Sequence, residues 1–170
     1  SSWQIPIPFT NYDDVPNTVM LRFKTNGLPT SNIPFSQSLW NKGNKVHLVL
    51  RYTGSAYASA SYSGSIKDPY YQYAYLDLYP NHDNHPNESA SVYLPFFDGG
   101  WWSARIVREG STSNFTLSSG NKLYTNGNNG TRLGFYSSST IAASDDSEWY
   151  ATPAISTFAS SSIVNGSLYN

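Results

Sequence analysis

Cysteine is absent from this chain of 170 residues, so neither a disulfide nor a thiolate metal site can form. Charge is also scarce, because only 12% of the residues are charged, about half the share in ordinary soluble domains. The basic residues are scattered, whereas binding to a nucleic-acid backbone needs them clustered. No apolar run approaches the roughly 18 residues of a membrane-spanning helix. We therefore expect no nucleic-acid partner and no membrane span.

Strong helix formers are rare, and the sequence is instead rich in residues that favour strands. Glu occurs only at positions 88, 109 and 148, while Tyr occurs 14 times and Trp five times. Alternation of apolar and polar residues predicts strands at 18–24, 45–52, 71–79, 101–108, 114–117, 132–136 and 149–158. Turn-forming Gly, Asn and Pro residues separate most of these segments. The pattern predicts an all-β, two-sheet antiparallel sandwich.

The alternation also predicts which face of each strand is buried. In segment 18–24 it places Val19, Leu21 and Phe23 on the inward face and Arg22 and Lys24 on the other. In segment 45–52 it places Val46, Leu48 and Leu50 inward. The serine-rich segments 137–147 and 160–162 are predicted to be loops. Nothing divides the chain, so residues 1–170 are expected to form one domain, either complete or as a piece of a longer chain.

One segment resembles a known family. Residues 98–110 read Asp-Gly-Gly-Trp-Trp-Ser-Ala-Arg-Ile-Val-Arg-Glu-Gly, and Asn-Phe-Thr-Leu follows at 114–117. This arrangement of turn, Trp-led strand, charged turn and strand resembles laminin G-like domains of the concanavalin A-like lectin/glucanase superfamily. The resemblance implies a jelly-roll sandwich that binds carbohydrate or protein, sometimes with calcium. The family's final strand, which pairs beside its first, is not evident after Tyr169, so either the chain stops short of it or another segment supplies it.

Two adjacent tryptophans give conflicting expectations about the core. Alternation with Ala104 and Ile106 places Trp102 inward, whereas the family resemblance makes Trp101 the structural tryptophan. The sequence leaves both interpretations open.

Catalytic groups are not apparent. A glycosidase needs two carboxylates on either side of the sugar bond, and the glucanase branch of the superfamily carries them in a Glu-x-Asp-x-Glu strand. No such strand occurs here, and the three Glu residues are isolated in or beside turns. We therefore expect a protein that is not an enzyme, with no catalytic residues.

Two groups of polar residues could bind a metal ion. His82, Asp83 and His85 lie close together between prolines, although a solvated loop explains them more simply than a zinc site. Calcium prefers oxygen ligands, and three further acids lie in predicted loops. These candidate metal ligands are Asp98, Asp145 and Asp146. Asp98 matches the Asp of the family turn, but an Asp that starts a turn commonly binds its own backbone. No other cofactor is expected.

Aromatic side chains on a solvent-facing strand supply the candidate ligand-binding residues. Stacked aromatic rings and nearby polar groups suit a sugar or a protein partner, while the same rings could simply stabilise the sheet through cross-strand pairs. The candidates are Tyr71, Tyr73, Tyr75, Trp149 and Tyr150.

Three functions remain open from the sequence. The first is a lectin-like binding module with a glycan or protein partner. The second is a structural or surface-decoration domain that contacts neighbouring subunits in a larger assembly, such as a viral particle or an adhesin, because an open sheet edge invites pairing. A hydrolase is the third and the least supported. The first two predict an extracellular location or one at a particle surface.

Overall fold

The computed structural model describes residues 3–7, 17–25, 34–43, 45–53, 73–109, 112–121, 134–150, 154–158 and 166–169. Almost all of the regular structure in these ranges is β, which confirms the predicted fold class. The elements are β1 (Trp3–Ile7), β2 (Thr18–Thr25), β3 (Phe35–Lys42), β4 (Val46–Tyr52), β5 (Ala74–Tyr79), β6 (Ala90–Leu94), β7 (Trp101–Arg108), β8 (Asn114–Asn121), β9 (Tyr136–Ala142), the short helix α2 (Ser147–Tyr150), β10 (Ala154–Phe158) and β11 (Gly166–Tyr169).

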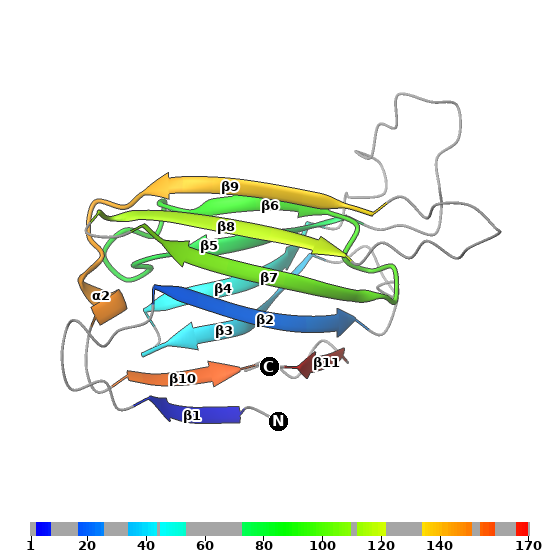
Figure 1. Ribbon diagram of the computed structural model, residues 1–170, viewed down its shortest axis with the longest axis horizontal. Helices are drawn as coiled ribbons and strands as arrows, with labels where there is room; N and C mark the ends of the chain where they lie inside the picture. The colour runs from blue at the N-terminus through cyan, green and yellow to red at the C-terminus, as the bar shows by residue number, and fades with distance from the viewer. Residues whose placement is uncertain are drawn as a thin grey trace.

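The strands form two antiparallel sheets that pack as a sandwich (Figure 1). The six-stranded sheet has the order β1-β10-β3-β4-β5-β6, and the five-stranded sheet has the order β11-β2-β7-β8-β9. Strand β9 lies beside β6, where the backbone N–H of Ser91 donates to Ser139 Oγ at 3.3 Å. The two sheets therefore meet along this side, and β1 and β11 are the outermost strands on the other side.

The core between the sheets consists of the side chains that the alternation places inward. Leu21 and Phe23 of β2, and Val46, Leu48 and Leu50 of β4, are buried as predicted. Their burial removes apolar surface from water, which is the main force that holds the two sheets together.

Trp102 is fully buried against Phe96, with ring centroids 4.8 Å apart, whereas Trp101 faces outward. The alternation therefore identified the structural tryptophan correctly, and the expectation drawn from the family resemblance was wrong at this position.

Two predicted segments have different structures. Residues 137–142, expected within a loop, belong to strand β9, which begins at Tyr136, the last residue of the strand predicted at 132–136. Hydroxyl side chains of β9 bond to its neighbours; Thr116 and Thr140, for example, are 3.2 Å apart at Oγ1. Residues 147–150, expected at the end of a loop and the start of a strand, form α2, and β10 begins only at Ala154. Both differences arise because tertiary contacts override a weak local pattern.

Strands β3 and β6 were not predicted, and strands at both ends of the chain complete the sheets. β10 pairs with β1, and β11 pairs with β2. A segment near the end of the chain thus lies beside the first strand, which the sequence had left unresolved. No helix in the described ranges is long and apolar enough to cross a membrane.

Candidate ligand-binding groove

The outer face of the five-stranded sheet carries a shallow groove of about 470 Å³, which we call the outer groove. It crosses β2, β7, β8 and the start of β9. Its lining residues are Met20, Arg22, Trp101, Ser103, Arg105, Ser118, Ser119, Gly120, Asn121 and Tyr136. Most are outward-facing residues of neighbouring strands, so the groove rests on a hydrogen-bonded sheet rather than on a loop.

The turn before β7 determines which tryptophan reaches this face. Asp98 Oδ1 accepts hydrogen bonds from the backbone N–H of Gly100 at 2.8 Å and from Trp102 Nε1 at 2.9 Å. Gly99 has a φ of 73°, a left-handed conformation that suits glycine. Because Trp102 is held inward by Asp98 and successive side chains alternate, Trp101 must point outward.

Trp101 supports an arginine at one side of the outer groove. Its side chain is 37% exposed, and the guanidinium carbon of Arg22 lies 5.4 Å from the centroid of its ring. Arg22 and Trp101 come from the paired strands β2 and β7. This cation–π contact limits the orientations of a long side chain and directs a planar set of donors toward the groove.

A tyrosine borders the opposite side. Tyr136 is 74% exposed and lies beside Gly120, its cross-strand partner on β8. A Cβ atom on Gly120 would lie 3.3 Å from Tyr136 Cδ2 and 3.0 Å from the carbonyl oxygen of Phe135. The absence of a side chain at Gly120 therefore lets the Tyr136 ring approach the sheet surface.

Two of the three predicted tyrosines lie at the other sheet, where they pack against a third tyrosine. Tyr73 and Tyr75 contact Tyr93, with ring centroids 5.1 and 4.5 Å apart. The guanidinium carbon of Arg51 lies 4.5 Å from the centroid of Tyr75. Tyr71 lies outside the described residues. We call this set the tyrosine cluster, and its contacts match the cross-strand packing that the sequence offered as the simpler explanation.

An ion pair between partly exposed Arg51 and buried Asp77 adjoins the tyrosine cluster. Arg51 Nε donates to Asp77 Oδ2 at 2.5 Å, and Ser91 Oγ donates to Asp77 Oδ1 at 2.6 Å. The hydrogen bond to Asp77 raises the pKa of Arg51, and burial raises the pKa of Tyr79. These contacts join β4, β5 and β6 across their outer face, which is a structural role.

Trp149 and Tyr150 were expected among the solvent-facing aromatics, and the structure corrects the first. Trp149 is only 2% exposed and lies between Trp40 of one sheet and Phe115 of the other, with centroids 6.0 and 5.2 Å away. Tyr150 is half-buried beneath Arg108, whose guanidinium carbon lies 4.3 Å from the ring centroid. The helical turn α2 directs Trp149 into the core.

The three predicted calcium ligands do not meet. Asp146 pairs with Arg108 at the end of β7, at 2.9 Å, whereas Asp98 lies before Trp101 at its start. An eight-residue strand separates the two sites by roughly 23 Å at about 3.3 Å per residue. Asp98 caps its own turn, and Asp145 belongs to a different network. In the ranges that the structure describes, no three His, Cys, Asp or Glu residues form a group suited to a metal ion, the predicted histidine loop included.

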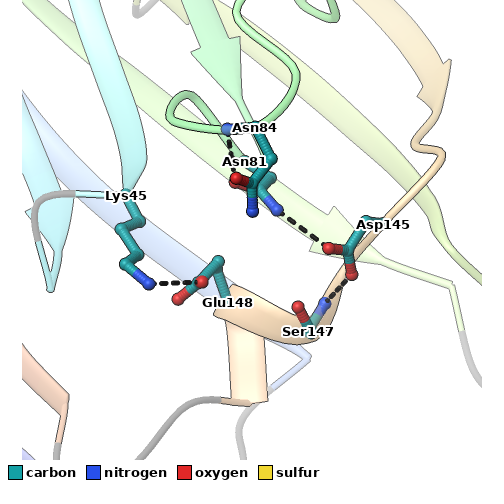
Figure 2. A network of polar contacts seen from close by, with 6 residues as sticks. All are labelled: Lys45, Asn81, Asn84, Asp145, Ser147 and Glu148. Carbon is teal, nitrogen blue, oxygen red and sulfur yellow. Dashed lines mark hydrogen bonds and ion pairs between the residues drawn. The ribbon is translucent and has the colours of Figure 1, made fainter.

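Asp145 instead anchors the turn that leads into α2 (Figure 2). It accepts hydrogen bonds from the backbone N–H of Ser147 at 2.9 Å and from Asn81 Nδ2 at 3.1 Å. The first of these bonds is the main reason that the pKa of Asp145 is lowered. Lys45 adds an ion pair with Glu148 at 2.6 Å. The network ties α2 to two loops of the six-stranded sheet.

Sequence reasoning did not identify the outer groove. The alternation correctly placed Arg22 on an outward face, and it left the face of Trp101 open. It did not indicate that these two residues are neighbours in the sheet. Tyr136 was placed at the end of a strand without a function. The signal available in the sequence was the pair of adjacent tryptophans. Because successive side chains of a strand point to opposite faces, one of the two must face outward.

No family model, curated protein or solved structure matches this chain. Nothing in these comparisons identifies a laminin G-like or concanavalin A-like domain.

Proposed function

We propose that this protein is a non-enzymatic, lectin-like binding module that holds a glycan in the outer groove. One observation carries the proposal: exposed Trp101 and Tyr136 border a groove on a hydrogen-bonded sheet, and its lining also contains hydroxyl side chains. The weakly apolar C–H face of a pyranose ring stacks on aromatic side chains, and its hydroxyl groups need fixed hydrogen-bonding partners. Ser103 and Ser118 offer such partners.

The dimensions of the groove suit a short stretch of glycan. Trp101 and Tyr136 lie on β7 and β9, two strand spacings apart, which is roughly 10 Å. The volume of about 470 Å³ lies within the range of small-molecule sites. The described lining residues include no Asp, Glu or His that could serve as an acid–base pair, which favours binding over hydrolysis. A jelly-roll strand order and an extracellular or particle-surface location accompany this proposal.

A glycan array followed by titration calorimetry of the best ligand tests the proposal. We expect micromolar binding that Trp101→Ala and Tyr136→Ala each weaken about tenfold or more, because each change removes one aromatic contact surface. Tyr75→Ala, in the tyrosine cluster on the opposite face, is the matched control and should leave affinity unchanged. If Tyr75→Ala abolishes binding and the groove variants do not, the tyrosine cluster is the site.

A structural role in a larger assembly is the second candidate, and the outermost strands favour it. In the described part of the chain, β1 pairs only with β10, and β11 pairs only with β2. Both strands lie on the same side of the sandwich (Figure 1). Free strand edges can pair with a neighbouring subunit. A defined oligomer in light scattering, lost when Leu168 is replaced by proline, would support this role.

A further inference from the structure

We infer that the glycan in the outer groove carries a carboxylate, as in a sialic or uronic acid, and that Arg22 and Arg105 bind it. This inference deepens the proposed function and rests on it. It starts from the charges on this face. The outward-facing charged side chains on the described β2 and β7 strands are Arg22, Lys24 and Arg105, all of them positive, although the whole chain has a net charge of −1.

The arginines of the groove differ from the other arginines of the structure in their partners. Arg51 pairs with Asp77, and Arg108 pairs with Asp146. Among the described residues, neither Arg22 nor Arg105 forms an ion pair, and the groove lining contains no carboxylate. An anionic ligand would supply the negative charge that Asp77 and Asp146 supply to Arg51 and Arg108.

The two arginines are close enough to act on one ligand. Arg22 is opposite Ser103 in the pairing of β2 with β7, and Arg105 is two residues farther along β7. Such diagonal neighbours lie about 7–8 Å apart at Cα, well within the combined reach of two arginine side chains. Guanidinium groups bind carboxylates through two parallel hydrogen bonds, and Trp101 already restricts one of these groups.

A carboxylated sugar matches the groove better than other anions do. Its ring would contact Tyr136 while its carboxylate meets Arg22 and Arg105, so both features of the groove are used. A nucleic-acid backbone would instead need a longer run of positive charge than three residues. The carboxylates of an acidic peptide would pair with the two arginines, but they would not contact the exposed ring of Tyr136.

The test compares matched ligands that differ in a carboxylated sugar. Titration calorimetry would use 3′-sialyllactose with lactose, and an oligosaccharide of glucuronic acid with its glucose counterpart. We expect the acidic member of at least one pair to bind about tenfold more tightly or better, the effect of one charge-assisted hydrogen bond. Arg105→Gln should remove that preference, and Arg22→Lys should reduce it because the charge remains but the planar fork is lost.

Lys24→Gln is the control, because it removes one positive charge from the same face at a residue that does not line the groove. It should leave the preference intact. Equal binding of neutral and acidic partners, unaffected by Arg105→Gln, would overturn the inference while leaving glycan binding in place. An equal response to Lys24→Gln, or equally tight binding of a polyglutamate peptide or a DNA oligonucleotide, would overturn it in favour of general electrostatic attraction. Failure of every glycan to bind would overturn both proposals.

Discussion

Trp101 and Trp102 are neighbours in the chain with opposite environments, which makes them a matched pair for measuring burial. Trp102→Phe removes core volume and the hydrogen bond to Asp98, so we expect the free energy of unfolding to fall by about 2 kcal/mol. Trp101→Phe should change it by about 0.5 kcal/mol or less, because the ring faces outward. Urea unfolding followed by circular dichroism measures both. Equal losses would contradict the assignment of the two faces.

Lys42 is a second residue whose environment makes a measurable difference. It is only 6% exposed, its ammonium donates to the carbonyl oxygen of Trp149, and burial lowers its pKa from 10.5 to about 8. Between these values the unfolded chain binds more protons than the folded one, so this group makes stability rise with pH. Lys42→Met removes this titrating group. The free energy of unfolding of the variant, relative to that of the wild type, should therefore fall by roughly 2 kcal/mol as pH rises from 8 to 10.5.

Lys45 provides the control for that measurement. Its hydrogen bond to Glu148 raises its pKa above 10.5, so its contribution to stability is present below about pH 10.5 and is lost as pH rises through the folded pKa. Lys45→Met should therefore leave the slope of stability against pH unchanged between 8 and 10.5. A flat difference between Lys42→Met and wild type would mean that Lys42 is solvated in the folded protein.

At the scale of single residues, the sequence predicted burial well wherever a strand alternates clearly. Leu21, Phe23 and Leu48 were assigned to the correct face because each strand is long and regular. For Trp102 the alternation pointed to the correct face, but the sequence left the choice between Trp101 and Trp102 open. Trp149 was not, because its direction depends on a helical turn of four residues that is held by contacts with distant loops. A pattern with period two cannot reveal such a turn.

At the scale of elements, Gly120 couples the packing of β8 and β9 to the proposed site. In Gly120→Ala the new Cβ would press on the Phe135 carbonyl oxygen and on the Tyr136 ring, so we expect a loss of about 1–2 kcal/mol in stability. The displaced ring should also weaken glycan binding. Ser118→Ala, on the same face of β8, is the control and should have little effect on stability. Unchanged stability and affinity in Gly120→Ala would show that the position of the Tyr136 ring does not depend on the missing side chain at Gly120.

The turn before α2 should be sensitive to acid. Asp145 accepts the backbone N–H of Ser147 as a helix cap does, so Asp145→Ala should cost about 1 kcal/mol at pH 7. Because the folded pKa lies below the unfolded one, the contribution of Asp145 is present above about pH 4 and is lost as pH falls through the folded pKa. The variant and the wild type should therefore converge in acid.

The exposed carboxylate of Asp83, in the nearby loop, serves as the comparison for Asp145. Asp83→Ala should change stability by about 0.5 kcal/mol or less at every pH in the series. If the difference in the free energy of unfolding between Asp145→Ala and the wild type stayed constant from pH 7 to pH 2, the Asp145 side chain would stabilise the turn without its charge.

Several elements escaped prediction for identifiable reasons. β9 reads Tyr-Ser-Ser-Ser-Thr-Ile-Ala, and its inward side meets β6 through hydroxyl groups rather than a row of apolar side chains. β3 contains an irregularity between Ser38 and Trp40, which breaks the period of two. Hydrophobic alternation detects strands that face an apolar core regularly, and neither of these strands does so.

At the scale of the whole molecule, strand pairing was the main information that the sequence did not provide. β2 pairs with β7, and β7 with β8, so Arg22 comes to lie beside Trp101 and near Arg105 although many residues separate them in the chain. The outer groove exists only because of this arrangement. Local patterns determine the face of each residue, but they do not determine which strands become neighbours.

The shared core predicts that the sandwich unfolds as one unit. Trp149 contacts Trp40 of one sheet and Phe115 of the other, and β6 meets β9 along one side, so neither sheet keeps its apolar face covered without the other. We expect a single transition in urea, with the same midpoint by circular dichroism and by tryptophan fluorescence. A reductant should not shift it, because the chain has no cysteine. Two separate midpoints would mean that one sheet outlasts the other.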